Sequence, residues 1–106
     1  MGILGFSRKE NIGEFASELC KELTAKYPVA MDNNSQSMVS EKNLSKTLEG
    51  VLIKAADFKT RNKLGVIGKA KLINAFQWEL KDAGYTDKFV KLAVEGITAY
   101  TSRKAS

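Results

Sequence analysis

The sequence predicts an all-α fold, a single domain spanning residues 1–106 and built as a bundle of about four helices. Three observations predict it. Apolar residues recur at three- and four-residue steps along four segments, which is the pattern of amphipathic helices. No alternating apolar run is bounded by hairpin turns, and the chain contains only one proline. With 106 residues, the chain is long enough to bury one core without a metal or a disulfide.

The first helix is expected from about Arg8 to Tyr27. Ser7, followed three residues later by Glu10, has the spacing of a capping box, in which each residue satisfies a backbone N–H of the other. The helix is expected to end before Pro28, because the residue before a proline avoids the helical region. The buried stripe is predicted to comprise Ile12, Phe15, Leu19, Leu23 and Tyr27.

The sequence offers little chemistry for catalysis or metal binding. It has no histidine and one cysteine, Cys20, so it lacks both the usual nucleophile–histidine pairs and an ordinary zinc ligand set. We therefore expect no enzyme activity, no cofactor and no metal. Cys20 lies beside the buried stripe and is expected to be a packed thiol, and a lone cysteine fits a cytoplasmic location. Glutamates at 10, 14, 18 and 22 predict a solvated face, with a surface for a basic partner as the alternative.

A long loop, residues 28–39, is expected between the first and second helices. This segment is rich in Asp, Asn and Ser, which favour turns by bonding to their own backbone. The second helix is expected to begin after Ser40, because Val39 and Leu44 have the spacing of a hydrophobic staple. It is expected to end between Phe58 and Asn62. Its predicted stripe is Leu44, Leu48, Val51, Leu52, Ala55 and Phe58.

The third helix, about residues 65–83, is expected to be the central one. Its main apolar face is predicted to comprise Val66, Ala70, Leu72, Ile73, Phe76, Leu80 and Ala83. A second row on another side comprises Ile67, Lys71, Asn74 and Trp78. A helix that is apolar on more than one side lies between other elements or against a partner. Gly84 is expected to end the helix, as glycine commonly does.

The fourth helix is expected to start after a Thr86 cap, and its face is predicted to comprise Phe89, Val90, Ala93, Val94, Ile97 and Tyr100. The turn at Gly84 resembles that of a helix-turn-helix, but few base-contacting donors follow, so an ordinary helical hairpin is preferred. Residues 1–6 form an apolar extension that is expected to pack on the core, and residues 102–106 a frayed tail.

Positive charge is concentrated in the second half of the chain. The net charge is +5, from 17 Lys and Arg against 12 Asp and Glu. Between residues 54 and 71, Asp57 is the only acidic residue beside six basic ones: Lys54, Lys59, Arg61, Lys63, Lys69 and Lys71. Such asymmetry can indicate an anionic partner, or it can be a solvated junction between helices.

Two functional hypotheses follow, and a weaker third. The preferred one is a non-enzymatic protein-interaction module that binds a protein partner or itself through Ile67, Lys71, Asn74 and Trp78, since tryptophan is enriched at interface hot spots. The alternative is nucleic-acid binding through the basic segment 54–71, with Trp78 stacking on bases. The third is attachment to a membrane surface through Ile3, Leu4, Phe6, Arg8 and Lys9. No apolar run approaches the ~20 residues needed to span a bilayer.

Overall fold

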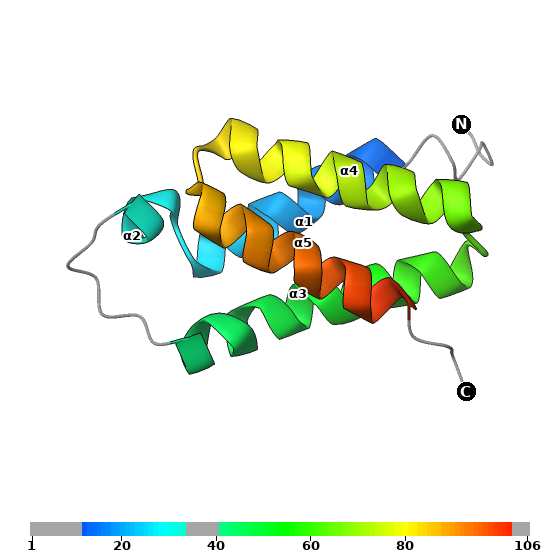
Figure 1. Cartoon of the computed structure of the whole chain (residues 1–106), viewed down its shortest axis with the longest axis horizontal. Helices are drawn as coiled ribbons and strands as arrows, with labels where there is room; N and C mark the ends of the chain where they lie inside the picture. The colour runs from blue at the N-terminus through cyan, green and yellow to red at the C-terminus, as the bar shows by residue number, and fades with distance from the viewer. Residues whose placement is uncertain (1–11, 34–40, 103–106) are drawn as a thin grey trace.

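The computed structural model describes residues 12–33 and 41–102 (Figure 1). Its helices are α1 (Ile12–Lys26), α2 (Val29–Asn33), α3 (Glu41–Arg61), α4 (Val66–Ala83) and α5 (Asp87–Ser102). Those two ranges contain no strand, so the all-α prediction is confirmed, and a long helix lies in each of the four predicted segments. The N-terminal extension, the capping box at Ser7 and the tail beyond Ser102 lie outside the described residues.

The connection between α1 and α3 differs from the predicted loop, because residues 29–33 form the short helix α2, so that the described part of the chain holds five helices. Asp32 and Asn33 bond to distant groups as well as local ones. The Asp32 carboxylate accepts hydrogen bonds from the Tyr27 hydroxyl at 3.0 Å and from the Thr86 backbone N–H at 2.6 Å. The Asn33 amide donates to the Gly84 carbonyl at 3.1 Å. Helix α2 therefore ties the end of α1 to the α4–α5 turn.

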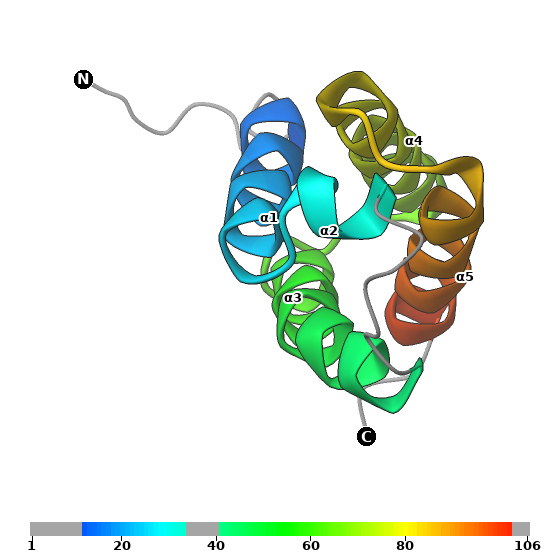
Figure 2. The ribbon, with the colours of Figure 1, turned by 90° about the vertical axis from the view of Figure 1, so that its left-hand side faces the viewer.

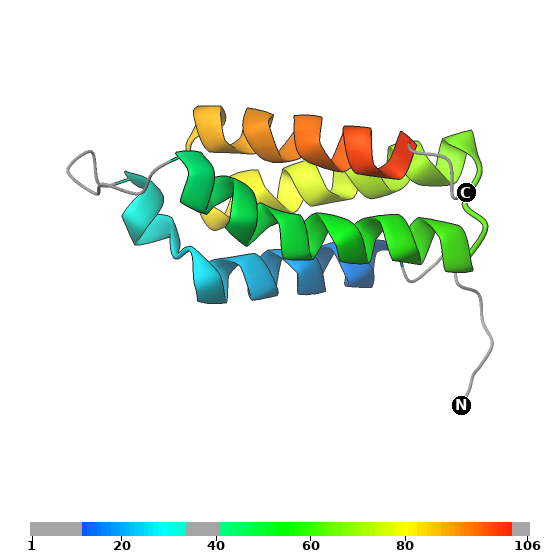
Figure 3. The ribbon, with the colours of Figure 1, turned by 90° about the horizontal axis from the view of Figure 1, so that it is seen from below.

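The four long helices lie at the corners of a square when the bundle is viewed from the α2 end (Figure 2). Helix α1 packs against α3 and α4, and α5 packs against the same two helices. Helices α1 and α4 run in one direction while α3 and α5 run in the other (Figures 1 and 3). Helix α4 is the third of the four predicted helices, and the prediction that it is central is wrong. It occupies one corner of the bundle, and its second row, Ile67, Lys71, Asn74 and Trp78, lies on the outside.

The core is formed by the predicted stripes. Leu72, Phe76 and Leu80 of α4 are fully buried, and Phe15 of α1 stacks on Phe58 of α3 with ring centroids 3.9 Å apart. The remaining core side chains come from the same stripes, together with Ala16, Cys20 and Tyr85. Helices α1, α3 and α5 thus contribute the faces that their apolar spacing indicated, and α4 contributes part of its predicted face.

Three residues of the predicted α4 face are exposed and correct that prediction. Val66 is 85% exposed, and Ala70 and Ala83 are also exposed. On a helix, Val66 lies about 80° and Ala70 about 120° around the axis from Phe76. The buried arc of α4 is therefore narrower than the predicted apolar face, and it excludes these side chains; Ala83 lies at the last turn.

The predicted end of α4 and the predicted start of α5 are confirmed. Gly84 has φ 107°, in the left-handed region that favours glycine, and the N–H groups of Gly84 and Tyr85 bond to the last carbonyls of α4. The Thr86 hydroxyl accepts a hydrogen bond from the Phe89 N–H at 3.3 Å, as a helix cap does. This turn sets the direction in which α5 leaves α4.

Candidate interaction surface

The row Ile67, Lys71, Asn74 and Trp78, here called the α4 outer face, lies on the solvent side of α4. All four residues are exposed, Ile67 to 73% and Trp78 to 62%. The opposite side of the same helix holds the fully buried Leu72, Phe76 and Leu80. The structure thus brings the four predicted binding residues together along one side of one helix.

Trp78 is accompanied by a cation from the next turn of α4. The Lys81 ammonium nitrogen lies 5.7 Å from the centroid of the Trp78 ring, within the range of a cation–π contact. This contact leaves most of the indole surface accessible to solvent, since the residue is 62% exposed. A large aromatic side chain with an unburied face can contribute much area to a contact with another molecule.

A hollow of about 460 Å³ opens beside the first turn of α4. It is lined by Ile12 of α1, residues 62–68 and Lys71, so it shares Ile67 and Lys71 with the α4 outer face. The α3–α4 turn shapes it: Lys63 adopts a left-handed conformation with φ 53°. Most of the aliphatic lining comes from Ile12, Leu64 and residues 66–67. The sequence did not indicate this hollow, because Ile12 is brought to it by tertiary packing and few residues other than glycine adopt positive φ.

The six cations of the basic segment do not form one surface. Lys54 bonds to Glu22 of α1 at 2.5 Å, Arg61 bonds to Asp57 at 2.7 Å, and Lys69 contacts the Ser102 hydroxyl at the end of α5. Lys63 and Lys71 line the hollow, and Lys59 is half-buried. Of the six, Lys71 alone belongs to the α4 outer face.

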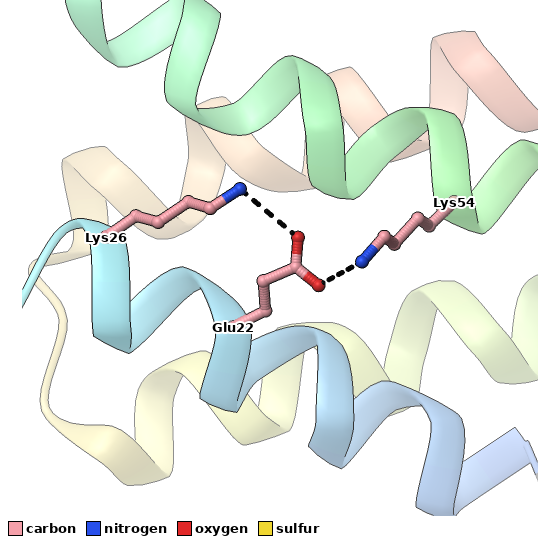
Figure 4. A network of polar contacts seen from close by, with 3 residues as sticks. All are labelled: Glu22, Lys26 and Lys54. Carbon is pink, nitrogen blue, oxygen red and sulfur yellow. Dashed lines mark hydrogen bonds and ion pairs between the residues drawn. The ribbon is translucent and has the colours of Figure 1, made fainter.

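Glu22 links α1 to α3 and has a structural role that the spacing of the glutamates did not reveal. Its carboxylate bonds to Lys54 at 2.5 Å and to Lys26 at 3.4 Å (Figure 4). The hydrogen bond from Lys54 lowers the pKa of the Glu22 carboxyl below its ordinary value. Glu14 and Glu18 are exposed, as predicted for a solvated face, and Glu10 lies outside the described residues.

Cys20 is a packed thiol. The residue is 6% exposed, and its sulfur lies 3.6 Å from the Glu79 carbonyl oxygen of α4. Burial raises the pKa of the Cys20 thiol, which disfavours the nucleophilic thiolate. Across residues 12–33 and 41–102, no cluster of three or more His, Cys, Asp or Glu side chains could hold a metal ion. None of the helices in those ranges is long and apolar enough to cross a membrane.

Comparisons with models of known protein families, with functionally characterised proteins and with solved structures found no match to this chain. The functional interpretation of the α4 outer face and of the hollow therefore rests on their geometry and chemistry.

Proposed function

We propose that this chain is a non-enzymatic helical interaction module that binds a protein through the α4 outer face. The observation that carries the proposal is the exposure of Ile67, 73%, and Trp78, 62%, on one side of a helix whose other side is fully buried. Solvating such side chains is unfavourable, and covering them gains roughly 25 cal/mol per Å² of apolar area.

The composition of this face suits a protein contact. Interface cores are enriched in tryptophan and other large side chains, and polar groups around them provide orientation. Lys71 and Asn74 lie between the two large apolar residues. The Lys71 ammonium group can donate hydrogen bonds, and the Asn74 amide can both donate and accept them. A partner that buries Ile67 and Trp78 would form the apolar core of such an interface, and hydrogen bonds to Lys71 and Asn74 would orient it.

Nucleic-acid binding is the second candidate, favoured by the position of Lys71 and Lys81 on the same helix as the exposed Trp78. An indole with cations nearby can stack on a base while the cations contact phosphates. Against this candidate, Lys54 and Arg61 are engaged in ion pairs with Glu22 and Asp57. The positive field of the basic segment is therefore partly neutralised and divided among several faces.

Photo-crosslinking in the cells that make the protein tests the proposed function. A photoreactive amino acid is placed at Ile67 in one variant and at Ile53, 53% exposed on α3, in a matched control. We expect a protein adduct from position 67 and little from position 53. Equal yields from the two positions, no protein adduct from position 67, or adducts with nucleic acid alone would contradict the proposal.

A further inference from the structure

We infer that the partner is a second copy of this chain, bound with the two α4 helices antiparallel so that each Trp78 enters the hollow of the other copy. The inference rests on the proposed function and specifies its partner. It combines the hollow, the exposed indole and the spacing of the residues between them. A symmetric dimer of this kind uses the same surface patch on both subunits, which must therefore be self-complementary.

The spacing of the α4 outer face provides that complementarity. Ile67, Lys71, Asn74 and Trp78 follow each other at steps of four, three and four residues, which is the seam spacing of packed helices. This pattern reads the same from either end. A two-fold axis between residues 72 and 73 therefore places Ile67 level with the second copy's Trp78, and Lys71 level with its Asn74.

The hollow lies where this symmetry requires it. Ile67 and Lys71 line the hollow, and Trp78 lies eleven residues beyond Ile67, about 16 Å along the helix at 1.5 Å per residue. The antiparallel arrangement brings each indole beside the other copy's Ile67, at the opening of the hollow. Aromatic anchors that fill a pocket on the partner are typical interface hot spots. A parallel arrangement would instead bring indole against indole and hollow against hollow.

The two central positions fix the register. In the antiparallel pair each Lys71 can donate to the side-chain carbonyl of the second copy's Asn74, and polar residues at seam positions specify register at a cost in stability. The two Lys71 residues lie only about 4.5 Å apart along the pair, which adds repulsion. A parallel pair would place the two Lys71 residues directly opposite each other, where their repulsion would be stronger. Ala70 and Ala75 flank the seam and are small enough to permit close approach.

The expected dimer is weak. Helix α4 has 18 residues and is about 27 Å long. Stable interfaces bury about 800 Å² on each partner, and one helix face of this length provides roughly half of that. With its polar centre, such a contact is expected to have a dissociation constant of roughly tens to hundreds of micromolar.

Sedimentation equilibrium of the purified full chain over the micromolar to millimolar range tests the dimer. We expect reversible dimerisation that Trp78→Ala weakens about a thousandfold, because the substitution removes one hot-spot side chain from each copy and each loss is worth about thirtyfold. Ile53→Ala, which removes an exposed isoleucine on α3, is the matched control and should leave the dissociation constant unchanged. A monomer up to millimolar concentration, or a dimer that Trp78→Ala leaves intact, would overturn the inference.

Charge substitutions at Asn74 test the antiparallel register. Asn74→Asp creates two Lys71–Asp pairs across an antiparallel dimer, and should tighten it about threefold to tenfold at low salt. Asn74→Lys gathers four ammonium groups at the same place and should weaken it. In a parallel dimer both substitutions set like charges against each other, so weakening by both variants would overturn the register. No effect from either would overturn the proposed interface.

The failure of this inference is distinguishable from failure of the proposed function. A chain that sediments as a monomer but forms adducts with a different protein from position 67 retains the proposed function and loses the self-association. If the chain sediments as a monomer and gives no protein adduct from position 67, both the self-association and the proposed protein-binding function are wrong.

Discussion

Removing the Asp32 carboxylate tests whether α2 stabilises the bundle. In Asp32→Ala, the Tyr27 hydroxyl and the Thr86 N–H lose the acceptors that they contact at 3.0 Å and 2.6 Å. Hydrogen bonds to a charged group contribute about 1.5–3 kcal/mol each, and partial solvent access reduces that value. We therefore expect the free energy of unfolding to fall by about 2–4 kcal/mol, with a midpoint temperature lower by about 10–25 °C.

The assay is thermal and urea unfolding followed by far-ultraviolet circular dichroism, with Asp57→Ala as the control. Asp57 also holds a cation, Arg61, at 2.7 Å, but both side chains are exposed. Its removal should therefore change stability by no more than about 1 kcal/mol. A double-mutant cycle with Tyr27→Phe should show coupling between Tyr27 and Asp32. Equal losses of unfolding free energy in Asp32→Ala and Asp57→Ala would refute the conclusion that α2 stabilises the bundle by binding the α4–α5 turn.

Three further outcomes are expected. Phe76→Ala, at a fully buried position, should cost about 3–5 kcal/mol in urea unfolding, and a loss below ~1 kcal/mol would contradict the assigned core. Cys20, whose thiol pKa is raised by burial, should react with a thiol reagent only as the chain unfolds; rapid labelling of the native protein would contradict its burial. Burial and Asp32 raise the pKa of Tyr27 to about 12, against about 10 in an unfolded chain. The folded state therefore retains the proton longer, and stability should fall as pH rises from about 10 toward 12. Tyr27→Phe should reduce this dependence without abolishing it, because burial also raises the pKa of Tyr85; a dependence as steep as that of the unsubstituted chain would contradict it.

The sequence predicted the elements whose stabilising contacts are local or periodic. The stripes of α1, α3 and α5 were identified from apolar spacing, because a helix repeats its buried face every three to four residues. Gly84 and Thr86 were identified for the same reason, since each acts on backbone groups within a few positions. Such features are determined mainly by residues that are close in the sequence, so they can be predicted without knowing the tertiary packing.

Features that depend on distant contacts were missed. Helix α2 is held by a hydrogen bond between Asp32 and Thr86, which are 54 positions apart, so its composition indicated only a loop. Close packing of α5 on α3 occurs at Gly96, where an added Cβ would lie 2.8 Å from a Leu52 methyl carbon. The burial of Thr101 was also missed; its hydroxyl donates to the Ile97 carbonyl at 2.7 Å, so this polar side chain is buried without an unsatisfied group.

The candidate site was predicted in part. Helical spacing grouped Ile67 and Trp78 on one side of α4, but it could not determine whether another helix covered them. That depends on how the four helices are placed at the corners of the bundle. The hollow combines Ile12 with the α3–α4 turn, and its shape depends on the left-handed conformation of Lys63, which no sequence pattern specified.

The fluorescence of Trp78, measured against the concentration of the full chain, tests the central claim most directly. The chain contains one tryptophan, so its emission reports on this side chain alone. If the α4 outer face binds a second copy, raising the concentration from micromolar to millimolar should shift the emission to shorter wavelength and protect it from acrylamide quenching. Emission that stays that of an exposed indole over the whole range, and that changes only when nucleic acid is added at low salt, would contradict it.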